Sequence, residues 1–294
     1  YVAGEVGMSL DQAMALNGRH GDRVNFVFKP SLVYEHIDVN LDNPVLADRR
    51  VRRALLYAID RKAISTQLFD GYQPVANSSI NPLDLVYSAN TKRYPLDREK
   101  AAKLLDAAGW RLRDNGIRYN AKGERLQLLI MTTAGNKTRE LVQQVLQSNW
   151  RQVGIDMRIR NEPARVFFGS TVRRRKFSGL AMYAWLSSPQ NVPRGQLHSE
   201  EIPSAEGGWS GQNYPGLRSP AFDAVLDGLE TKCEPQENMR LWHKLQKLYM
   251  EELPALPLYF RAQPHIMPKW LKGVRPTGHQ YSSSLWIEDW TVGK

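Results

Sequence analysis

Apolar and polar residues recur with a helical period in several segments of the chain. In residues 48–68 the apolar positions, such as Val51, Leu55 and Ile59, share one stripe, and most of the basic residues lie elsewhere. This spacing predicts an amphipathic helix with Asp48 as its N-cap. The same period predicts one helix between Asp97 and Gly109 and three more at 137–152, 220–231 and 236–252.

Strand-like segments alternate with these helices. Turn signals at Asn115-Gly116 and Lys122-Gly123 predict a hairpin over 111–131 that leads into an apolar strand. We predict strands at 126–131, 155–160, 179–185 and 253–260, a short helix at 165–175, and an irregular aromatic tail from Pro264. The order strand, helix, strand, helix, strand indicates parallel α/β units, in which ligands bind beyond the carboxyl ends of the strands.

One of those ends carries candidate ligand-binding residues. The strand that contains Tyr183 and Trp185 stops abruptly and is followed by Ser187 and Ser188. The two aromatic rings can stack on a ligand or pack in the core, and the two hydroxyls can bind a ligand or satisfy the backbone at the strand end. The following loop, 187–218, is long and aperiodic, as binding loops often are. It adds Arg194, Asn213 and Tyr214 as candidates.

Composition and charge narrow the class of protein. The chain has 294 residues, of which 42% are hydrophobic, and a formal net charge of +10. No run of about 18 apolar residues occurs, and Cys233 is the single cysteine, so no internal disulfide forms. The excess charge raises nucleic acid or another polyanion as a partner. The densest basic run, Arg173–Lys176, lacks interleaved aromatics for stacking bases, so we expect no nucleic-acid partner.

Signatures of catalysis are sparse. The six histidines show no metal-ligand spacing, and neither a nucleophile elbow nor a phosphate loop is present. The adjacent carboxylates Glu200 and Glu201 leave a hydrolase as an alternative, although such loop carboxylates are usually solvated. We therefore expect a protein that is not an enzyme, without a metal site or cofactor.

Several phrases, in order, resemble one family. They are "AGEVG", "DVNLDNPVLADRRVRRALLYAIDRKAI", "YPLDREKAAKLLDAAGW", "LVQQVLQSNWRQVGI", "AFDAVLDGLE", "ELPALPLYF" and "WLKGVRPTG". This set is similar to the family 5 extracellular solute-binding proteins, the peptide-, dipeptide- and nickel-type receptors of bacterial ABC importers. The resemblance covers nearly the whole chain.

The resemblance implies a fold, a division into lobes and a location. It implies an α/β fold of the periplasmic binding protein type, with a mixed sheet flanked by helices. Residues 1–38 would be a remnant of the N-terminal lobe, 39–264 the C-terminal solute-binding lobe, and 265–294 a segment returning to the first lobe. The chain opens without a starting methionine or leader, and we expect the signal peptide and half of the ligand cavity to belong to a missing part. The implied protein is periplasmic, monomeric and a partner of ABC permease subunits.

The resemblance also bears on the solute. In peptide-binding relatives the residue three positions after the strand tryptophan is an aspartate that holds the peptide's amino group, and here it is Ser188. Dipeptide-type relatives receive the carboxylate with an arginine near the position of Thr133, and Arg139 is the nearest arginine. We expect a peptide or peptide-like solute whose amino group is met elsewhere. A non-peptide solute of opine, sugar or metal-chelate type is the alternative within this fold, and a basic polyanion binder is the alternative of another class.

Overall fold

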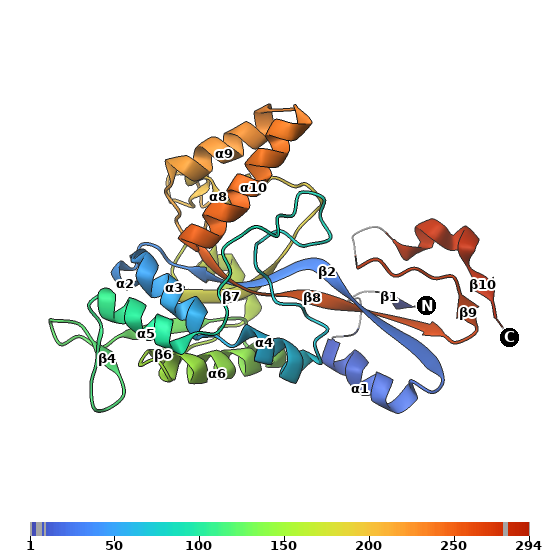
Figure 1. The fold of residues 1–294 in the computed structure, drawn as a ribbon, viewed down its shortest axis with the longest axis horizontal. Helices are drawn as coiled ribbons and strands as arrows, with labels where there is room; N and C mark the ends of the chain where they lie inside the picture. Colours follow the sequence, from blue (N-terminus) through green and yellow to red (C-terminus); the bar gives the residue numbers. More distant parts are fainter. Residues whose placement is uncertain (1, 4–7, 9, 279–281, 294) are drawn as a thin grey trace.

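A six-stranded mixed sheet organises the protein (Figure 1). The computed structural model describes residues 2–3, 8, 10–278 and 282–293. The strands of the sheet lie in the order β1-β8-β2-β7-β5-β6. Their bounds are β1 Val2–Ala3, β2 Val24–Val39, β5 Gln127–Met131, β6 Asp156–Ile159, β7 Leu180–Leu186 and β8 Ala255–Pro268. Two small antiparallel sheets pair β3 Arg111–Leu112 with β4 Arg118–Tyr119, and β9 Leu271–Lys272 with β10 Thr291–Val292.

Two long antiparallel strands run through the middle of this sheet. The 16-residue β2 pairs with β8 along most of its length, from Val24 opposite Pro268 to Asp38 opposite Ala255. The register shifts between Pro30 and Tyr34 and again between Glu35 and His36. Such irregularities bend a strand and increase its twist. β2 and β8 therefore connect the large body to the smaller part that holds both described chain ends.

Helices cover both faces of the sheet. The hairpin of α9 and α10 stands on one side, and α4 and α6 lie along the other (Figure 1). The main helices are α1 Leu10–His20, α3 Arg49–Ala58, α5 Arg98–Ala107, α6 Lys137–Arg151, α9 Pro220–Thr231 and α10 Pro235–Glu252. Shorter ones are α2 Pro44–Ala47, α4 Arg61–Ala63, η1 Ile64–Leu68, α7 Ala164–Val166, η2 Phe167–Val172, α8 Arg194–Leu197, η3 Ser199–Glu201 and η4 Ser283–Asp289.

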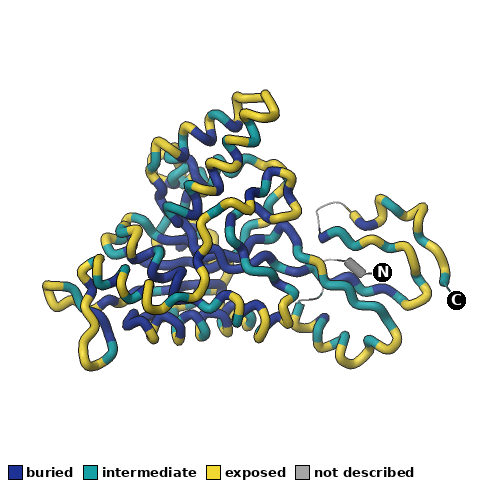
Figure 2. Tube along the Cα trace, in the orientation of Figure 1, coloured by how far each residue is buried: buried dark blue, intermediate teal, exposed yellow. Residues whose placement is uncertain are grey.

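The core continues through the sheet into the helices on either side. Figure 2 shows buried residues along the crossing strands, with exposed ones at the tip of the α9–α10 hairpin and around the β3–β4 turn. Trp150 of α6 is completely buried and donates its indole N–H to the Leu55 carbonyl at 2.9 Å, which ties α6 to α3. Among the described residues, no helix is long and apolar enough to cross a bilayer.

The helix predicted over 48–68 is interrupted. Asp48 caps it as predicted, accepting from the Arg50 N–H at 2.8 Å. However, α3 ends at Ala58, because Ile59 is extended and Asp60 begins a new helix. The Arg61 guanidinium lies buried there and donates to the carbonyls of Ala76, Pro257 and Tyr94, and burial lowers its pKa to about 10. The three buried carbonyls need the Arg61 guanidinium as a donor, and this requirement outweighs the helical spacing of apolar residues across 48–68.

The other predicted elements have mixed outcomes. The five strands and helices from 126 to 186 are confirmed, and β5 lies parallel to both β6 and β7. The prediction of an irregular tail from Pro264 is wrong, since β8 extends to Pro268 and is followed by β9, η4 and β10. The longest strand, β2, is absent from the predicted elements. The mixed sheet with flanking helices agrees with the predicted fold class.

Candidate ligand site

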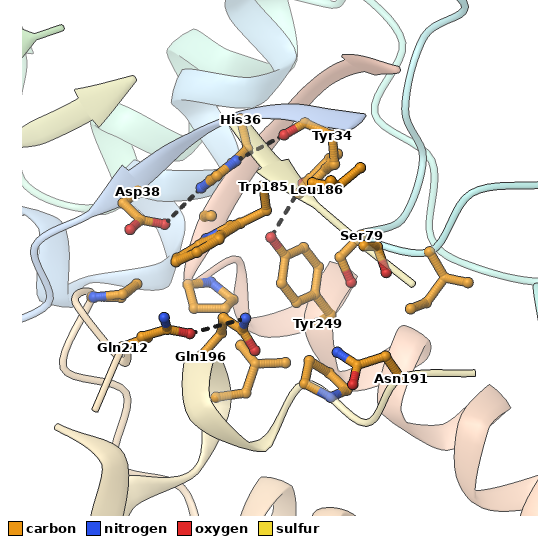
Figure 3. Close-up of a pocket in the computed structure, with 17 residues that line it drawn as sticks. Tyr34, His36, Asp38, Ser79, Trp185, Leu186, Asn191, Gln196, Gln212 and Tyr249 are labelled. Atoms are coloured by element: carbon orange, nitrogen blue, oxygen red, sulfur yellow. Dashed lines mark hydrogen bonds and ion pairs between the residues drawn. The ribbon is translucent and has the colours of Figure 1, made fainter. Parts of the chain in front are cut away.

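A pocket forms where the end of β7 meets β2 (Figure 3). Side chains alternate between the faces of a strand, and Tyr34, His36 and Asp38 of β2 point to the same face as Trp185 of β7. The loops after β7, the turn at Ser79 and Ile80, and Tyr249 of α10 close the other sides. The cavity measures about 70 Å³. For comparison, a cavity needs roughly 10–15 Å³ to hold one water molecule. It therefore has room for one side chain of a ligand and not for a whole peptide.

Trp185 lines this pocket, and Tyr214 from the long loop packs against its indole. The two rings are stacked, with centroids 6.2 Å apart and an angle of 12° between their planes. Arg175 fixes the loop, because its Nε donates to the Tyr214 carbonyl at 2.9 Å and its Nη2 lies 2.7 Å from Asp42. Stacked aromatic pairs gain about 0.5–1.5 kcal/mol beyond their burial. The indole is thus held as a preformed flat surface.

Tyr183 supports Trp185 from below. Its side chain is only 2% exposed, and its hydroxyl donates to the Asp38 carboxylate. Its ring meets that of Trp185 edge-on at 5.8 Å. Burial raises the pKa of Tyr183 well above its ordinary value, and the negative charge of Asp38 raises it further. Tyr183 therefore stays protonated and acts as a donor beneath the pocket.

A second pair of tyrosines joins β2 to α10 at the pocket wall. The hydroxyls of Tyr34 and Tyr249 lie 3.1 Å apart. Burial raises the pKa of both, so neither ionises near neutral pH. His36 stacks on Tyr34 with ring centroids 5.0 Å apart, and its Nε2 lies 3.2 Å from Asp38 Oδ1. That contact has ion-pair range but not the alignment of a hydrogen bond. These contacts make the wall rigid.

The edge of β7 beside the pocket is open. Ser187 donates its N–H to the Leu32 carbonyl on β2, and in an antiparallel pair alternate residues direct their backbone groups to the same partner. The backbone groups of Ala184 and Leu186 therefore point away from β2. On that side β5 pairs with β7 only at Leu180 and Ala181. Within the described part of the chain, no group bonds to the outward backbone of Ala184 or Leu186.

The structure brings together some of the predicted site residues. Trp185 and Ser187 line the pocket, and Tyr214 stacks on the ring of Trp185 without lining the pocket itself. Tyr183 lies in the core directly beneath, which agrees with its packing alternative. Ser188 is exposed at the rim, where its carbonyl accepts from the Asn191 N–H at 3.2 Å.

Three other predicted residues serve the surrounding structure. Asn213 is completely buried, and its carboxamide donates to the carbonyls of His198 and Leu217 and accepts from the N–H groups of Gly216 and Leu217. Arg194 turns to α9, with Asp227 at 2.6 Å, and binds Glu200 at 2.8 Å. Thr133 is buried at the end of β5, 3.4 Å from Arg139 Nη1. None of the three lines the pocket.

Sequence reasoning missed the wall formed by β2. Tyr34, His36 and Asp38 lie in a stretch that the resemblance assigns to a remnant lobe. The available signal was the period of two at Tyr34, His36 and Asp38 in "YEHIDV", which the charged Glu35 between them obscures. In the described part of the chain, no group of three His, Cys, Asp or Glu residues could hold a metal ion.

The sheet and the pocket define the class of protein. Solved structures with the same fold are binding proteins of the periplasmic peptide-binding type, and this chain has that fold. The family "Bacterial extracellular solute-binding proteins, family 5 Middle" matches residues 3–201. The chain belongs to this family.

Curated relatives are similar over most of this chain. The oligopeptide-binding protein AppA of Bacillus subtilis (strain 168) is 24% identical over 273 residues, which are 90% of this chain and 48% of AppA. The glutathione-binding protein GsiB of Salmonella typhi is 25% identical over 251 residues, 80% of this chain and 44% of GsiB. The chain thus spans about half the length of the curated relatives it matches.

Solved structures show the same coverage. An oligopeptide binding protein from Thermus thermophilus, complexed with a pentapeptide, superposes with a TM-score of 0.82 at 32% identity, over 92% of this chain and 49% of that protein. NikA from Brucella suis, in complex with Fe(III)-EDTA, has a TM-score of 0.82 at 20% identity, over 99% of this chain and 57% of NikA. The second likeness shows the fold alone.

Proposed function

We propose that this chain is the C-terminal lobe of a periplasmic receptor that binds a peptide and delivers it to an ABC permease. The observation that carries the proposal is the open edge of β7 at Ala184 and Leu186, beside the Trp185 pocket. An extended peptide can add to such an edge as a further strand, with its backbone supplying affinity and one side chain entering the pocket. The pentapeptide bound to the Thermus thermophilus relative supports this reading.

The predicted domain boundaries enter the same proposal. Residues 1–38 and 265–294 would join a first lobe, and residues 39–264 would form the second. β2 and β8 run across both boundaries. Closure of the two lobes around a solute would then bend these strands at their register shifts, as hinges of a few residues do. The receptor would act as a monomer, without catalysis, a cofactor or nucleic acid.

The peptide proposal is tested by removing single backbone hydrogen bonds. Calorimetry would compare a pentapeptide with copies that are N-methylated at one amide each. If the peptide pairs with the β7 edge, methylation at alternate amides weakens binding and methylation between them does not, because alternate residues face the strand. Uniform losses, or none, would contradict backbone pairing.

A non-peptide solute is the second candidate. Ser188 supplies no charge where the resemblance implies an aspartate, and NikA, of the same fold, was solved with Fe(III)-EDTA. Binding of a metal chelate or an opine with no binding of any peptide would favour it. A polyanion binder would instead lose affinity steeply as salt rises, and the same titrations at two salt concentrations separate that outcome.

A further inference from the structure

The wall of the Trp185 pocket carries a buried carboxylate. Asp38 lines the pocket and is only 4% exposed. Figure 3 shows it joined to His36 beside the indole of Trp185. Of the described residues that line the pocket, Asp38 is the one carboxylate, and none is a lysine or an arginine. The lining is therefore negative, although the chain as a whole carries a formal net charge of +10.

The chain gives this carboxylate fewer partners than a buried charge requires. Tyr183 donates its hydroxyl to Oδ2 of Asp38, and Oδ1 lies 3.2 Å from His36 Nε2. No lysine or arginine of the described segments pairs with Asp38. The buried Arg61 is close enough to act on Tyr34, but three carbonyls accept its donors and it does not line the pocket. Buried carboxylates are paired as a rule, so the counter-charge comes either from His36 or from a ligand.

The orientation of His36 decides between these two. Its Nδ1 lies 3.3 Å from the Tyr34 carbonyl, and because a carbonyl only accepts, this bond places the imidazole proton on Nδ1. Nε2 is then an acceptor. His36 is only 1% exposed, and Nε2 has no hydrogen-bond partner in the described part of the chain. A second proton on Nε2 would be poorly bound, because the contact with Asp38 is not aligned as a hydrogen bond. Two acceptors therefore lie side by side, and a donor from a ligand satisfies both.

The rest of the pocket suits a cation on an apolar stem. Burial raises the pKa of Tyr214, and the negative charge of Asp38 raises it further, so the field of the carboxylate reaches the ring that stacks on Trp185. The faces of aromatic rings attract cations. Ile80 and Leu197 line the same pocket with aliphatic groups. An alkyl chain can lie along such a surface while the charged group at its end meets the carboxylate.

We propose that the Trp185 pocket binds a primary ammonium group on an apolar stem. The ammonium pairs with Asp38 and donates to His36 Nε2, and the stem lies against the indole. An ammonium has three N–H donors and no acceptor, so it satisfies both atoms. Two groups of a peptide have this chemistry, the side chain of lysine and the α-amino terminus. The inference rests on the proposed function, because it names the group that a bound peptide places in the pocket.

The test is a calorimetric comparison, on the 294-residue chain, of alanine pentapeptides that carry one lysine or one norleucine. Each peptide is N-acetylated, and the substituted residue is moved through every position. Norleucine has the alkyl chain of lysine without the ammonium. At one position or more we expect lysine to bind about tenfold tighter than norleucine, since lysine alone gains a charged contact. The comparison is made on the wild-type chain, so it does not depend on the folding of any variant.

Three variants assign the preference to its residues. Asp38→Asn removes the charge and keeps an oxygen that can accept from Tyr183, and it should abolish the preference for lysine over norleucine. His36→Phe keeps an aromatic ring and removes Nε2, and it should reduce the preference by about threefold or more. The control is Asp156→Asn, which removes a carboxylate that pairs with Arg125 at 3.1 Å and does not line the pocket. It should leave the preference unchanged.

The source of the ammonium follows from pentaalanine with a free or an acetylated amino terminus. The pocket takes the α-amino group if the free form binds about tenfold tighter, if Asp38→Asn removes this difference, and if no lysine position gains. It takes the side chain of lysine if one lysine position gains in the acetylated series and acetylation of pentaalanine makes no difference.

Failure of this inference is distinguishable from failure of the proposed function. If peptides bind with no preference for lysine or for a free amino terminus, or if Asp38→Asn keeps the preference, the ammonium site is overturned while the peptide receptor stands. If no peptide binds, a titration with n-pentylamine and with neutral 1-pentanol, followed by the indole N–H resonance of Trp185, tests the pocket alone. Saturable binding of the amine only supports the ammonium site, and equal effects of the two probes, or none, overturn it.

Discussion

The indole of Trp185 lies stacked on the ring of Tyr214, with the ring centroids 6.2 Å apart and an angle of 12° between the ring planes. A strand end and a distant loop thereby form one aromatic surface. The surface exists before any ligand binds, because Arg175 holds the Tyr214 carbonyl. Preorganisation of this kind reduces the entropy lost on binding. The two residues are therefore expected to contribute to affinity as a unit.

Replacing the indole tests this surface. Trp185→Ala should weaken peptide binding by about 2 kcal/mol, roughly thirtyfold, as the loss of a central aromatic contact does. Trp185→Phe should recover part of the loss. Calorimetry measures both, and Trp270→Ala, which removes an exposed tryptophan far along the chain, is the control. Equal effects of the two alanine variants would show that the pocket plays no part.

Tyr183→Phe separates a packing role from a binding role. The change removes the hydroxyl that donates to Asp38 and keeps the ring. A hydrogen bond to a charged group contributes about 1.5–3 kcal/mol, so we expect a loss of stability of that size in urea unfolding. Peptide affinity should change less than with Trp185→Ala. A large loss of affinity at unchanged stability would instead assign Tyr183 to the ligand.

The buried charge of Glu35 predicts a pH dependence of stability. Burial alone would raise the pKa of Glu35, but the positive charges of Arg261 and Arg139 outweigh it and lower the pKa below its ordinary 4.5. A carboxylate with a depressed folded-state pKa stabilises the fold above its unfolded pKa and loses that contribution as pH falls through the folded value. The free energy of unfolding should therefore fall below pH 4.5, and less steeply in Glu35→Gln.

Glu35→Gln also removes the shared partner of two arginines. At pH 7 we expect a loss of about 3–5 kcal/mol, the cost of breaking a buried ion pair. Glu99→Gln, in an exposed pair with Lys103, should lose less than about 0.5 kcal/mol. Similar losses in the two variants would show that Glu35 is not buried as described.

Arg61 should be one of the most costly positions to replace. Arg61→Met leaves the carbonyls of Ala76, Pro257 and Tyr94 without their donor, and we expect a loss of about 3 kcal/mol or more. The control is Lys62→Met, the exposed neighbour on the same short helix. A thermal or urea unfolding curve compares the stability of the two variants. Unchanged stability of Arg61→Met would contradict the view that Arg61 stabilises the fold by donating to the three carbonyls.

Ser188→Asp tests the inferred register with peptide-binding relatives. An aspartate at this exposed rim should favour a peptide with a free amino group over its N-acetylated form by about tenfold. Wild-type protein should discriminate less. The measurement compares the affinities of the free and the N-acetylated peptide. If Ser188→Asp shows no greater preference for the free peptide than wild-type protein does, the peptide's amino group lies elsewhere.

Much of the fold was predictable because its helices and parallel strands have local signals. The periodic helices at 98–107 and 137–151 and the strand that ends just after Trp185 are set by apolar spacing and caps. β2 was not predicted because its residues Glu35, His36 and Asp38 are polar yet buried. Each is stabilised by contacts with residues far away in the chain or with neighbours on β2, and the local sequence does not show these contacts. The interruption at Ile59 likewise depends on the carbonyls that Arg61 reaches.

The site was predictable only where one element forms it. Trp185 and Ser187 could be predicted as pocket residues because they stand at the end of one strand. Tyr34 and Tyr249 could not, because they are 215 residues apart in the chain and meet only in the folded protein. Arg194 and Asn213 have the composition of ligand-binding residues, but their hydrogen bonds are used within the loop and by α9. A polar residue type does not reveal whether its partner is a ligand or the chain itself.

The central claim is that a peptide adds to the open edge of β7. Amide hydrogen exchange of Ala184 and Leu186, followed by NMR with and without a saturating pentapeptide, tests it most directly. We predict that exchange at these two amides slows by about tenfold or more when the peptide binds, because their N–H groups gain partners. Saturated binding with unchanged exchange at both amides would contradict the account.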